Sequence, residues 1–435
     1  MKIVELTPGA GGMYCGSCLR DHALVSTLQR MGHDAILAPM YLPMQLDDPS
    51  SGYEAPLFFG AVNVYLQQKS RLFRQAPEWM DRALDAPGLL RWAAGFVGKT
   101  NPEELGELTL SVLQGEHGKQ AKELEKLVRR LKGEVKPDIV CLSNALLLGL
   151  ARRIRADLNV PVICTLQGED TFIDGLPEPY RSQAWTVLEE RARDVELFIA
   201  VSHYHADIMQ RRLKLPPGQI RIVHNGIALD GFVPAAENTG PPVLGYFARL
   251  CRLKGAQTLV DAFVLLKQRN QIPGLKLKLG GSMTPADEAF VEGLRADLAQ
   301  RGLGGEVQFF PNLDRKQKLA FLQSLSVFSV PATYGESFGL YVLEALASGV
   351  PVVQPRHGAF PEILEMSGGG VLCDPDNPAA LADAIEKLLE DRQAARAVGL
   401  AGREKVLQYF NVDRMAREVS ELCESAKSQP KISPA

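Results

Sequence analysis

The sequence predicts an α/β protein with two doubly wound parallel sheets, one in each of two domains. Continuous apolar runs of strand length, typical of buried parallel strands, alternate with helical segments through residues 137–224 and again through 243–390. Between them, residues 235–242 (AAENTGPP) are polar, rich in Gly and Pro and without periodicity, which is typical of a domain boundary. At 435 residues the chain is also too long for one ordinary hydrophobic core.

The first domain, residues 1–235, opens on an expected strand (KIVEL), a glycine-rich loop that contains Gly12, and a helix around 19–31. Glycines in such a loop let the backbone approach a ligand closely. Cys15 and Cys18 form a C-x-x-C pair at the start of the helix. Because no second cysteine pair follows, we interpret them as small buried residues and not as a metal or redox site.

Residues 41–133 are less regular and more helical, and 77–97 form an amphipathic stretch. Packing against the domain's own core is the usual fate of such a stripe, and contact with an acceptor or a membrane surface is the alternative. Alternation of strand and helix resumes at Pro137, and the expected strands that follow are DIVCLS, VPVICTL, VELFIAVS and IRIVHN.

The second domain, residues 241–405, starts the alternation of strand and helix afresh. Its expected strands are PVLGYFA, LKLKLGG, VQFFP, residues 327–331, residues 350–353 and GGVLCD. Ligands of doubly wound sheets bind beyond the carboxyl ends of the strands. We therefore expect a ligand cleft between the two domains.

The composition indicates a globular protein, 46% hydrophobic and 23% charged. A net charge of −3 argues against nucleic acid as the main partner, since such proteins carry a basic surplus. No apolar run reaches the roughly 18 residues of a membrane span, and a strand begins directly after Met1, so we expect a cytoplasmic protein. The seven cysteines are scattered and odd in number, which argues against a disulfide framework.

Residues 329–362 carry the strongest chemical signal in the chain. A short strand runs into a loop that holds Glu336 and Gly339, and a helix with Glu344 on it follows. Unpaired backbone N–H groups at a helix N-terminus favour anions, phosphate above all. One carboxylate suits the vicinal hydroxyls of a ribose, and a second fits the hydroxyls of a sugar. The stretch therefore predicts half of a nucleotide-binding unit.

Two cations follow the first strand of the second domain. Arg249 and Lys254 lie five residues apart on one loop, and Gly255 opens the next helix. A guanidinium, an ammonium and a helix start together form a site for a diphosphate. Gly281, after another strand, can bring backbone close to the same ligand. Surface solvation is the alternative for any Arg–Lys pair, but the loop's position at a strand's carboxyl end argues against it.

These motifs together resemble those of retaining glycosyltransferase family 4. The resemblance rests on E-x7-E (Glu336 and Glu344) within GESFGLYVLEALASGVPVV, on the RL-x3-KG loop, and on Gly12 placed 20 residues before a GHD sequence. It spans nearly the whole chain. It implies the GT-B fold, in which two Rossmann-like domains face an interdomain cleft and a last helix, here 406–427, crosses back to the first domain.

The resemblance also implies the partners and the roles of the site residues. The second domain would bind a nucleotide-diphosphate sugar as donor, and the first domain would bind the acceptor. Arg249 and Lys254 would neutralise the diphosphate, and Glu336 would touch the transferred sugar, so we expect these three to be catalytic. The other expected donor contacts are Glu344 on the ribose, backbone N–H groups near Phe338, Gly339 and Leu340, Gly281, and Gly12 from the first domain.

This chain departs from the family pattern on the acceptor side. Gln167 stands where many members carry a histidine that faces the sugar, and Ser143 and Asn144 end a strand where histidine is frequent. Glutamine can hydrogen-bond a sugar hydroxyl, but it cannot become cationic or shuttle a proton. No DxD metal motif is visible. We expect neither a metal nor another cofactor.

The function predicted from the sequence is transfer of a hexosyl group from a nucleotide-diphosphate sugar to a hydroxyl acceptor, with retention of anomeric configuration. The acceptor would be a small molecule, a lipid or a glycan. Three alternatives stay open: elongation of an α-glucan as by a glycogen or starch synthase, a GT-B nucleotide-sugar epimerase or hydrolase, and a non-enzymatic binding protein. An epimerase or hydrolase needs no acceptor, and a binding protein releases no nucleotide.

Overall fold

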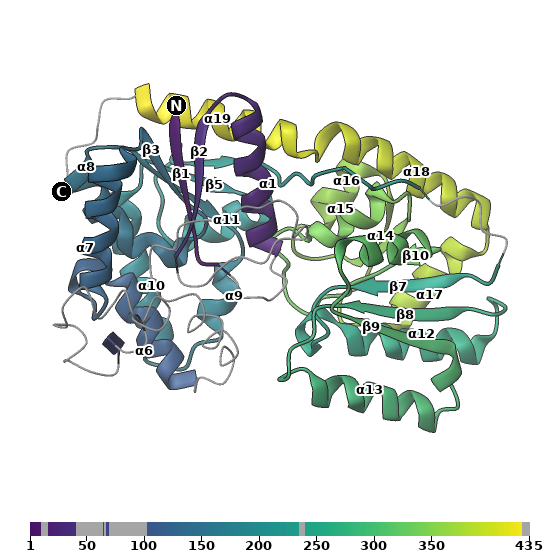
Figure 1. Cartoon of the computed structure of the whole chain (residues 1–435). Coiled ribbons are helices and arrows are strands. Elements are labelled where there is room, and N and C mark those ends of the chain that lie inside the picture. The colour runs from purple at the N-terminus through teal and green to yellow at the C-terminus, as the bar shows by residue number, and fades with distance from the viewer. Residues whose placement is uncertain (10–15, 41–63, 65–66, 69–101, 235–239, 429–435) are drawn as a thin grey trace. The chain divides into compact units, whose positions relative to one another are not determined.

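The structure, a computed structural model, describes residues 1–9, 16–40, 64, 67–68, 102–234 and 240–428. The chain divides into two compact units (Figure 1). The first unit comprises Met1–His224 with Asp413–Ala435, and the second comprises Asn225–Val412. Gly12, Cys15 and the amphipathic stretch 77–97 lie outside the described residues.

The first unit is built on a six-stranded sheet in which every neighbouring pair is parallel. All residues of β3 (IVCL) and β4 (VICTL) are buried, as continuous apolar runs require. In spatial order the strands are β2 (Asp34–Pro39), β1 (Lys2–Thr7), β3 (Ile139–Leu142), β4 (Val162–Leu166), β5 (Leu197–Ala200) and β6 (Ile220–Ile222).

Helices of the first unit follow its strands along the chain. The helical segment after β3 starts as a 3-10 turn, Ala145–Leu150, and becomes α-helical only afterwards. Its N-cap Asn144 accepts a hydrogen bond from the N–H of Leu146 at 3.0 Å. Among the described residues, the α-helices of this unit are α1 (Gly16–Arg30), α6 (Pro102–Leu113), α7 (Ala121–Arg130), α8 (Ala151–Leu158), α9 (Glu169–Asp174), α10 (Tyr180–Arg191), α11 (His203–Arg212) and α19 (Val412–Ser428).

The second unit has its own six-stranded parallel sheet. Together the two sheets confirm the predicted pair of doubly wound α/β structures. The central strand β10 is only two residues long, because its chain turns early into the loop that holds Glu336. In spatial order the strands are β12 (Gly370–Cys373), β11 (Val352–Pro355), β10 (Val327–Phe328), β7 (Val243–Phe247), β8 (Lys276–Gly281) and β9 (Val307–Pro311).

Helices of the second unit lie on both faces of its sheet; in Figure 1, α12 and α13 lie below the strands and α15 and α16 above them. Side-chain caps fix where several begin. Asp314 forms a capping box with Gln317, and Asn377 accepts from the N–H groups of Ala379 and Ala380. The helices are α12 (Ala256–Arg269), α13 (Glu288–Gln300), α14 (Arg315–Gln323), α15 (Leu340–Ala347), α16 (Phe360–Ser367), α17 (Pro378–Leu389) and α18 (Arg392–Tyr409).

The chain leaves one unit for the other twice, and the two crossings lie side by side on the second unit. Ile227 and Asn411 form a parallel bridge. Ile227 donates its N–H to the carbonyl of Phe410 at 2.9 Å, and its own carbonyl accepts from Val412 at 3.1 Å. A Cβ on Gly226 would come within 2.2 Å of the Asn411 carbonyl oxygen, so only glycine allows this approach.

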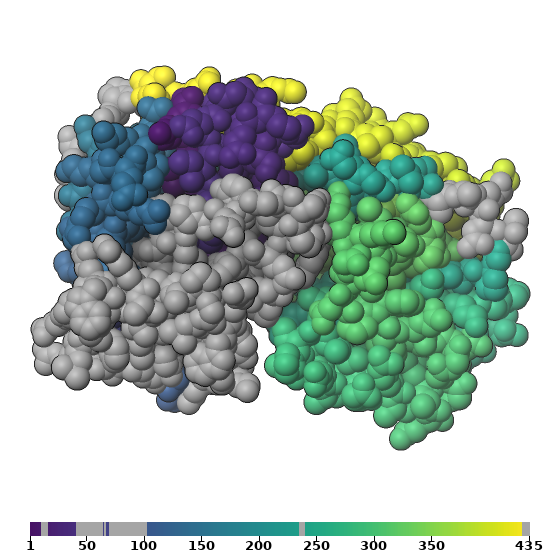
Figure 2. Space-filling model, viewed as in Figure 1, coloured from purple at the N-terminus to yellow at the C-terminus, as the bar shows by residue number. Residues whose placement is uncertain are grey.

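Helix α19 packs on the N-terminal strands and helix of the first unit, as the contact between the yellow and purple atoms in Figure 2 shows. His33 and Ser420 are hydrogen-bonded at 2.9 Å, and Lys427 pairs with Asp138 at 2.9 Å. The thiols of Cys141 and Cys423 lie 3.9 Å apart and are both buried. None of the described helices combines the length and apolar character that a membrane crossing requires.

Candidate functional site

Lys254 and Glu336, two of the predicted catalytic residues, are in direct contact within the second unit. The lysine Nζ lies 2.5 Å from the Oε2 atom of Glu336. The hydroxyl of Tyr341 donates to the same oxygen at 2.8 Å, and that of Tyr334 does so at 3.0 Å. One carboxylate oxygen therefore receives one ammonium and two phenol donors.

These donors keep the Glu336 carboxylate ionised although it is only 8% exposed. Burial alone would raise its pKa, but the Lys254 charge and the hydrogen bonds from Lys254, Tyr341 and Tyr334 lower that pKa below its ordinary value. Burial, together with the neighbouring Glu336 charge, raises the pKa of Tyr341 far above the ordinary value for a phenol. The cluster is therefore a buried negative charge that is fully compensated.

Two glycines bring the loops of this cluster together. Gly255 follows Lys254 at a φ of +75°, and a Cβ there would lie 1.8 Å from the carbonyl oxygen of Pro331. Gly358 has a φ of +60°, and a Cβ there would lie 2.6 Å from the backbone nitrogen of Glu336. Because any other residue would push these segments apart, the glycines hold the loop after β7 and the loop after β11 against the loop after β10.

Arg249 does not join the Lys254 cluster but is held by Asp287, just before α13. Its Nε and Nη2 atoms bind the carboxylate at distances of 3.0–3.2 Å. The buried Tyr246 donates its hydroxyl to the Arg249 carbonyl at 2.7 Å and so fixes the backbone. The side chain of Arg249 remains 51% exposed, and among the described residues its Nη1 group has no hydrogen-bond partner.

Glu344 lies on α15, whereas Glu336 lies in the loop before this helix, and the two residues have different partners. Its Oε1 atom pairs with the Nζ of Lys318, on α14, at 2.9 Å. The side chain of Lys318 is only 2% exposed and that of Glu344 13%. The two glutamates of the E-x7-E motif therefore each face their own lysine.

The remaining predicted donor contacts lie around the start of α15 and at the end of β8. Gly339 is the N-cap of α15 at a φ of +91°, and Leu340 is its first residue. Phe338 is buried and packs against Phe410, with ring centroids 6.2 Å apart. Gly281 ends β8 beside the Arg249 loop, where Leu250 donates its N–H to the Ser282 carbonyl at 2.9 Å. Only the backbone of this group is placed to meet an anion.

In the first unit, Gln167 lies beyond the carboxyl end of β4 and is held by neighbouring strands. Its amide nitrogen donates to the carbonyl of Ser143 at 2.6 Å and reaches Asp21 at 3.4 Å. Its backbone N–H donates to Glu169 at 2.7 Å. The ring of His205 accepts from the N–H of Gly168 at 3.1 Å. The predicted acceptor-side residue is therefore fixed by at least three elements of one sheet edge.

Beneath Gln167 lies a cluster of buried charges that the sequence analysis missed. Arg20 lies 3.0 Å from Asp21 and 4.0 Å from Glu5, and all three are at most 2% exposed. Burial raises the pKa of Glu5 to about 8; Asp21 adds to this rise and Arg20 opposes it. Burial raises the pKa of Asp21 too, although Arg20, Thr7 and Ser143 oppose the rise. Two carboxyl groups here share one cation.

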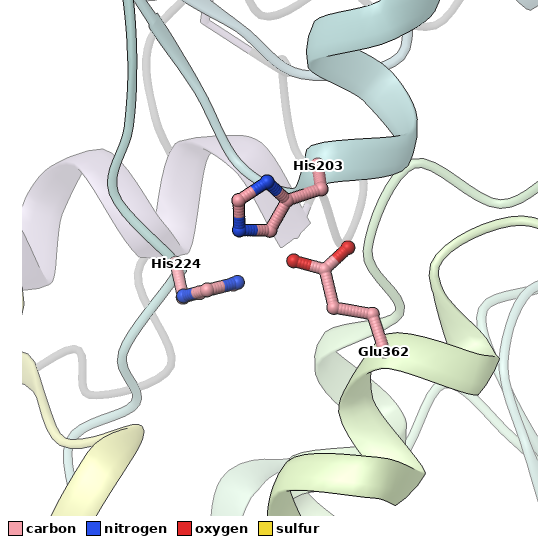
Figure 3. A group of neighbouring side chains, drawn as sticks. All are labelled: His203, His224 and Glu362. Atoms are coloured by element: carbon pink, nitrogen blue, oxygen red, sulfur yellow. The ribbon is translucent and has the colours of Figure 1, made fainter.

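Figure 3 shows two further histidines of the first unit, His203 at the start of α11 and His224 after β6. Their ring centroids lie 6.0 Å apart. Glu362, also labelled, belongs to α16 of the second unit. Two histidines alone do not supply the three protein ligands that a catalytic zinc ion uses.

Sequence reasoning missed Tyr334, Tyr341, Asp287 and Lys318. Tyr334 and Tyr341 flank Glu336 within residues 329–362, so nearness in sequence to a predicted site residue was the available signal. Lys318 lies on the same helix face as Leu322, at the i+4 spacing, and a lysine in the apolar phase of a helix is a detectable anomaly. The Asp287–Arg249 pairing joins two different strand–helix units and has no signal in one sequence.

Two family descriptions match consecutive parts of the chain. "Glycosyltransferase Family 4" matches residues 108–230, and "Glycosyl transferases group 1" matches residues 232–405. The chain belongs to glycosyltransferase family 4. The family matches thus include the segments that carry Gln167 in the first unit and the Lys254–Glu336 cluster in the second.

Solved structures of GT-B glycosyltransferases share the fold of this family 4 chain. Sucrose-phosphate synthase (tll1590) from Thermosynechococcus elongatus gives a TM-score of 0.71 at 21% identity, covering 97% of this chain and 98% of that one. Anabaena Alr3699/HepE in complex with UDP gives 0.68 at 18% identity, covering 98% and 100%. The two-sheet architecture is therefore GT-B, as the resemblance implied.

Among curated proteins, a D-inositol 3-phosphate glycosyltransferase from Corynebacterium jeikeium is 32% identical over 192 residues, 41% of this chain and 46% of that protein. Glycogen synthase from Mycobacterium tuberculosis is 26% identical over 301 residues, 67% of this chain and 70% of that protein. The chain thus spans about half the length of the first relative and 70% of the length of the second.

Proposed function

We propose that this chain transfers a hexosyl group from a nucleotide-diphosphate sugar to a hydroxyl acceptor with retention of configuration. The observation that carries the proposal is the contact of Lys254 with Glu336 next to the start of α15, all within the second unit. An ionised carboxylate for a sugar hydroxyl, an ammonium and a helix N-terminus meet there. A sugar linked to a diphosphate is the ligand class that needs these three groups together.

The charges in this site have a division of labour. Lys254 is partly buried and already holds Glu336, so its ammonium joins the sugar-side carboxylate to the diphosphate. Arg249 is held by Asp287 through two of its nitrogens and offers Nη1 to the diphosphate. These cations and the α15 N-terminus stabilise negative charge that grows on the leaving group.

In the proposed step, the bond between the anomeric carbon and the β-phosphate oxygen breaks. The acceptor oxygen bonds to the same carbon on the face that the leaving group vacates. The acceptor's proton passes to the departing phosphate oxygen, so the products are the glycoside and a nucleoside diphosphate. No residue needs to form a covalent intermediate in this scheme. We also propose that the step requires no metal, because the Lys254 and Arg249 cations would balance the charge of the diphosphate.

The partners follow from the same division. HepE was solved in complex with UDP and, in a second structure, with UDP-glucose. We therefore take UDP-sugars as the first donors to test. The acceptor, a small molecule, a lipid or a glycan, is assigned to the first unit, where Gln167 can hydrogen-bond a hydroxyl.

Elongation of an α-glucan is the second candidate function. The match to glycogen synthase, over 70% of that protein, favours it. Both candidates use the same donor step and differ in the acceptor, which is a growing glucan in one case and a different hydroxyl compound in the other.

The deciding experiment measures nucleoside diphosphate release from UDP-, GDP- and ADP-sugars by the purified chain. Each donor is tested alone, with a glucan primer, and with a panel of small hydroxyl acceptors, and every assay is run with and without EDTA. The proposal is supported if nucleoside diphosphate is released only with an acceptor and NMR shows that the product has the same anomeric configuration as the donor sugar. Release without acceptor indicates a hydrolase or epimerase, and binding without release indicates a binding protein. Activity that EDTA abolishes refutes metal independence.

A further inference from the structure

Lys318 is a buried charged residue to which the proposed mechanism gives no task. It lies on α14, is 1% exposed, and ranks among the largest fully buried side chains of the described residues. Burying an ammonium is costly unless an opposite charge lies next to it. Glu344 supplies that charge at 2.9 Å.

The ion pair joins α14 to the second turn of α15, where Glu344 is the predicted ribose contact. A carboxylate reads two vicinal hydroxyls only if it stays ionised and keeps one rotamer. The Lys318 ammonium binds Oε1 at 2.9 Å and so favours one rotamer of the glutamate side chain. The other oxygen is thereby turned to a fixed direction, which a glutamate without this partner would sample only part of the time.

We propose that Lys318 is a positioning residue for ribose recognition, acting through Glu344. The proposal rests on the proposed function, because it presumes that Glu344 contacts the ribose of the donor. It makes the chain's preference for ribonucleotide over deoxyribonucleotide donors depend on a lysine that touches no ligand. Each glutamate of the E-x7-E motif then works with its own lysine, Lys254 for the sugar and Lys318 for the ribose.

A purely structural ion pair is the competing explanation, and it makes a different prediction. A staple between α14 and α15 would lower the melting temperature when broken, but it would weaken binding of all nucleotides alike. Positioning of Glu344 would instead change the ratio between ribose and deoxyribose forms.

The test measures dissociation constants by calorimetry for UDP, 2′-deoxy-UDP and 3′-deoxy-UDP, or for the GDP or ADP series if the wild type binds that base instead. Lys318→Met removes the charge at similar length, and Lys318→Arg keeps it. Lys316→Met, on the exposed face of the same helix, is the matched control. Melting temperatures are recorded for every variant.

We expect the wild type to prefer the ribose forms by roughly tenfold or more, the value of one hydrogen bond to a charged group. Lys318→Met should reduce this preference at least about fivefold, Lys318→Arg should largely keep it, and Lys316→Met should not change it. Glu344→Ala removes both carboxylate oxygens and should abolish the preference, and adding Lys318→Met to it should change nothing more, since coupled residues are not additive.

A Lys318→Met variant that loses stability but keeps the full ribose preference overturns the inference and leaves Lys318 a structural staple. A Glu344→Ala variant that keeps the preference removes the ribose role from the proposed function itself. No binding of any nucleoside diphosphate by the wild type would refute the donor assignment as a whole. The three failures are therefore distinguishable.

Discussion

Each unit carries a buried carboxylate cluster beside the carboxyl ends of its strands, and the two respond to burial in opposite ways. In the first unit the pKa of Glu5 rises to about 8, whereas in the second unit the pKa of Glu336 falls below its ordinary value. Both residues are nearly inaccessible, at 2% and 8% exposure. Burial therefore does not explain the difference.

The number of positive charges explains it. Among the residues that the structure describes, Glu5 and Asp21 share one cation, Arg20, so one carboxyl group keeps its proton to avoid an uncompensated buried charge. Glu336 has Lys254 to itself and two phenol donors in addition. The first cluster is thus suited to holding a proton and the second to holding a negative charge against a sugar.

Removing Lys254 should break the comparison most severely. Lys254→Ala leaves Glu336 buried without a cation, so its pKa should rise above the ordinary value, and the diphosphate should lose a charge partner. We expect turnover to fall by about 10²–10³, as for loss of one preorganised charge stabiliser. Steady-state kinetics with the donor that the release assay identifies measures this loss of turnover. The exposed Lys316→Ala is the control, and unchanged kinetics of Lys254→Ala would refute the catalytic role.

Glu5→Gln should sharpen the comparison through stability. Between its ordinary pKa of 4.5 and its folded value of about 8, folded Glu5 binds a proton that the unfolded chain has released. The free energy of unfolding therefore falls as the pH rises through this window, by about 1.4 kcal/mol per pH unit for this group. Glutamine stays neutral, so the variant should exceed the wild type by about 2 kcal/mol or more near pH 8.5 and lose most of that advantage near pH 5.

Chemical denaturation across this pH range measures the effect of Glu5→Gln. Glu134→Gln, at an exposed position of the same unit, should follow the wild type at each pH. A constant difference between Glu5→Gln and the wild type would mean that Glu5 is ionised in the folded state, and the contrast between the two clusters would disappear.

Tyr341→Phe should have a smaller effect on the second cluster, because Lys254 and Tyr334 remain. The phenyl ring keeps its packing near Phe360 and Phe328, while Glu336 loses one donor. A hydrogen bond to a charged group is worth about 1.5–3 kcal/mol, so we expect kcat/KM to fall by about 10- to 100-fold. The pKa of Glu336 should move upward, and the acid limb of the pH–rate profile should move to higher pH with it. Tyr409→Phe, partly exposed on α18, is the control.

The parallel sheets could be predicted because their strands are buried on both faces and leave continuous apolar runs. Glu336, Lys254 and Gly281 could be singled out because each follows such a run. Their spatial partners could not. Lys254 and Glu336 come together because Gly255 packs on Pro331, a contact between loops that no local pattern encodes. Whether the predicted residues act on a donor sugar stays a prediction.

The buried charges of the first unit show the same limit. Glu5 stands between the apolar residues Val4 and Leu6 inside β1, and Arg20 and Asp21 look like ordinary surface residues of a helix. Only the packing of α1 onto the sheet makes them a cluster. A charged residue inside a fully apolar strand was the one signal that could have revealed it.

Asp287→Asn should produce the smallest change and locates the boundary of the second cluster. Asp287 touches Arg249 but not Lys254 or Glu336, so the variant weakens the hold on one cation and leaves the Glu336 cluster intact. Although burial acts to raise the pKa of Asp287, hydrogen bonds from Arg249 and Thr284 lower it below its ordinary value. Asparagine keeps one accepting oxygen for Arg249 but loses the charge. We expect kcat/KM for the donor to fall about tenfold, with no change in the pH–rate profile. Asp297→Asn, on α13, serves as the control. If Asp287→Asn lowered kcat as much as Lys254→Ala does, Arg249 and Lys254 would belong to one charge cluster instead of two.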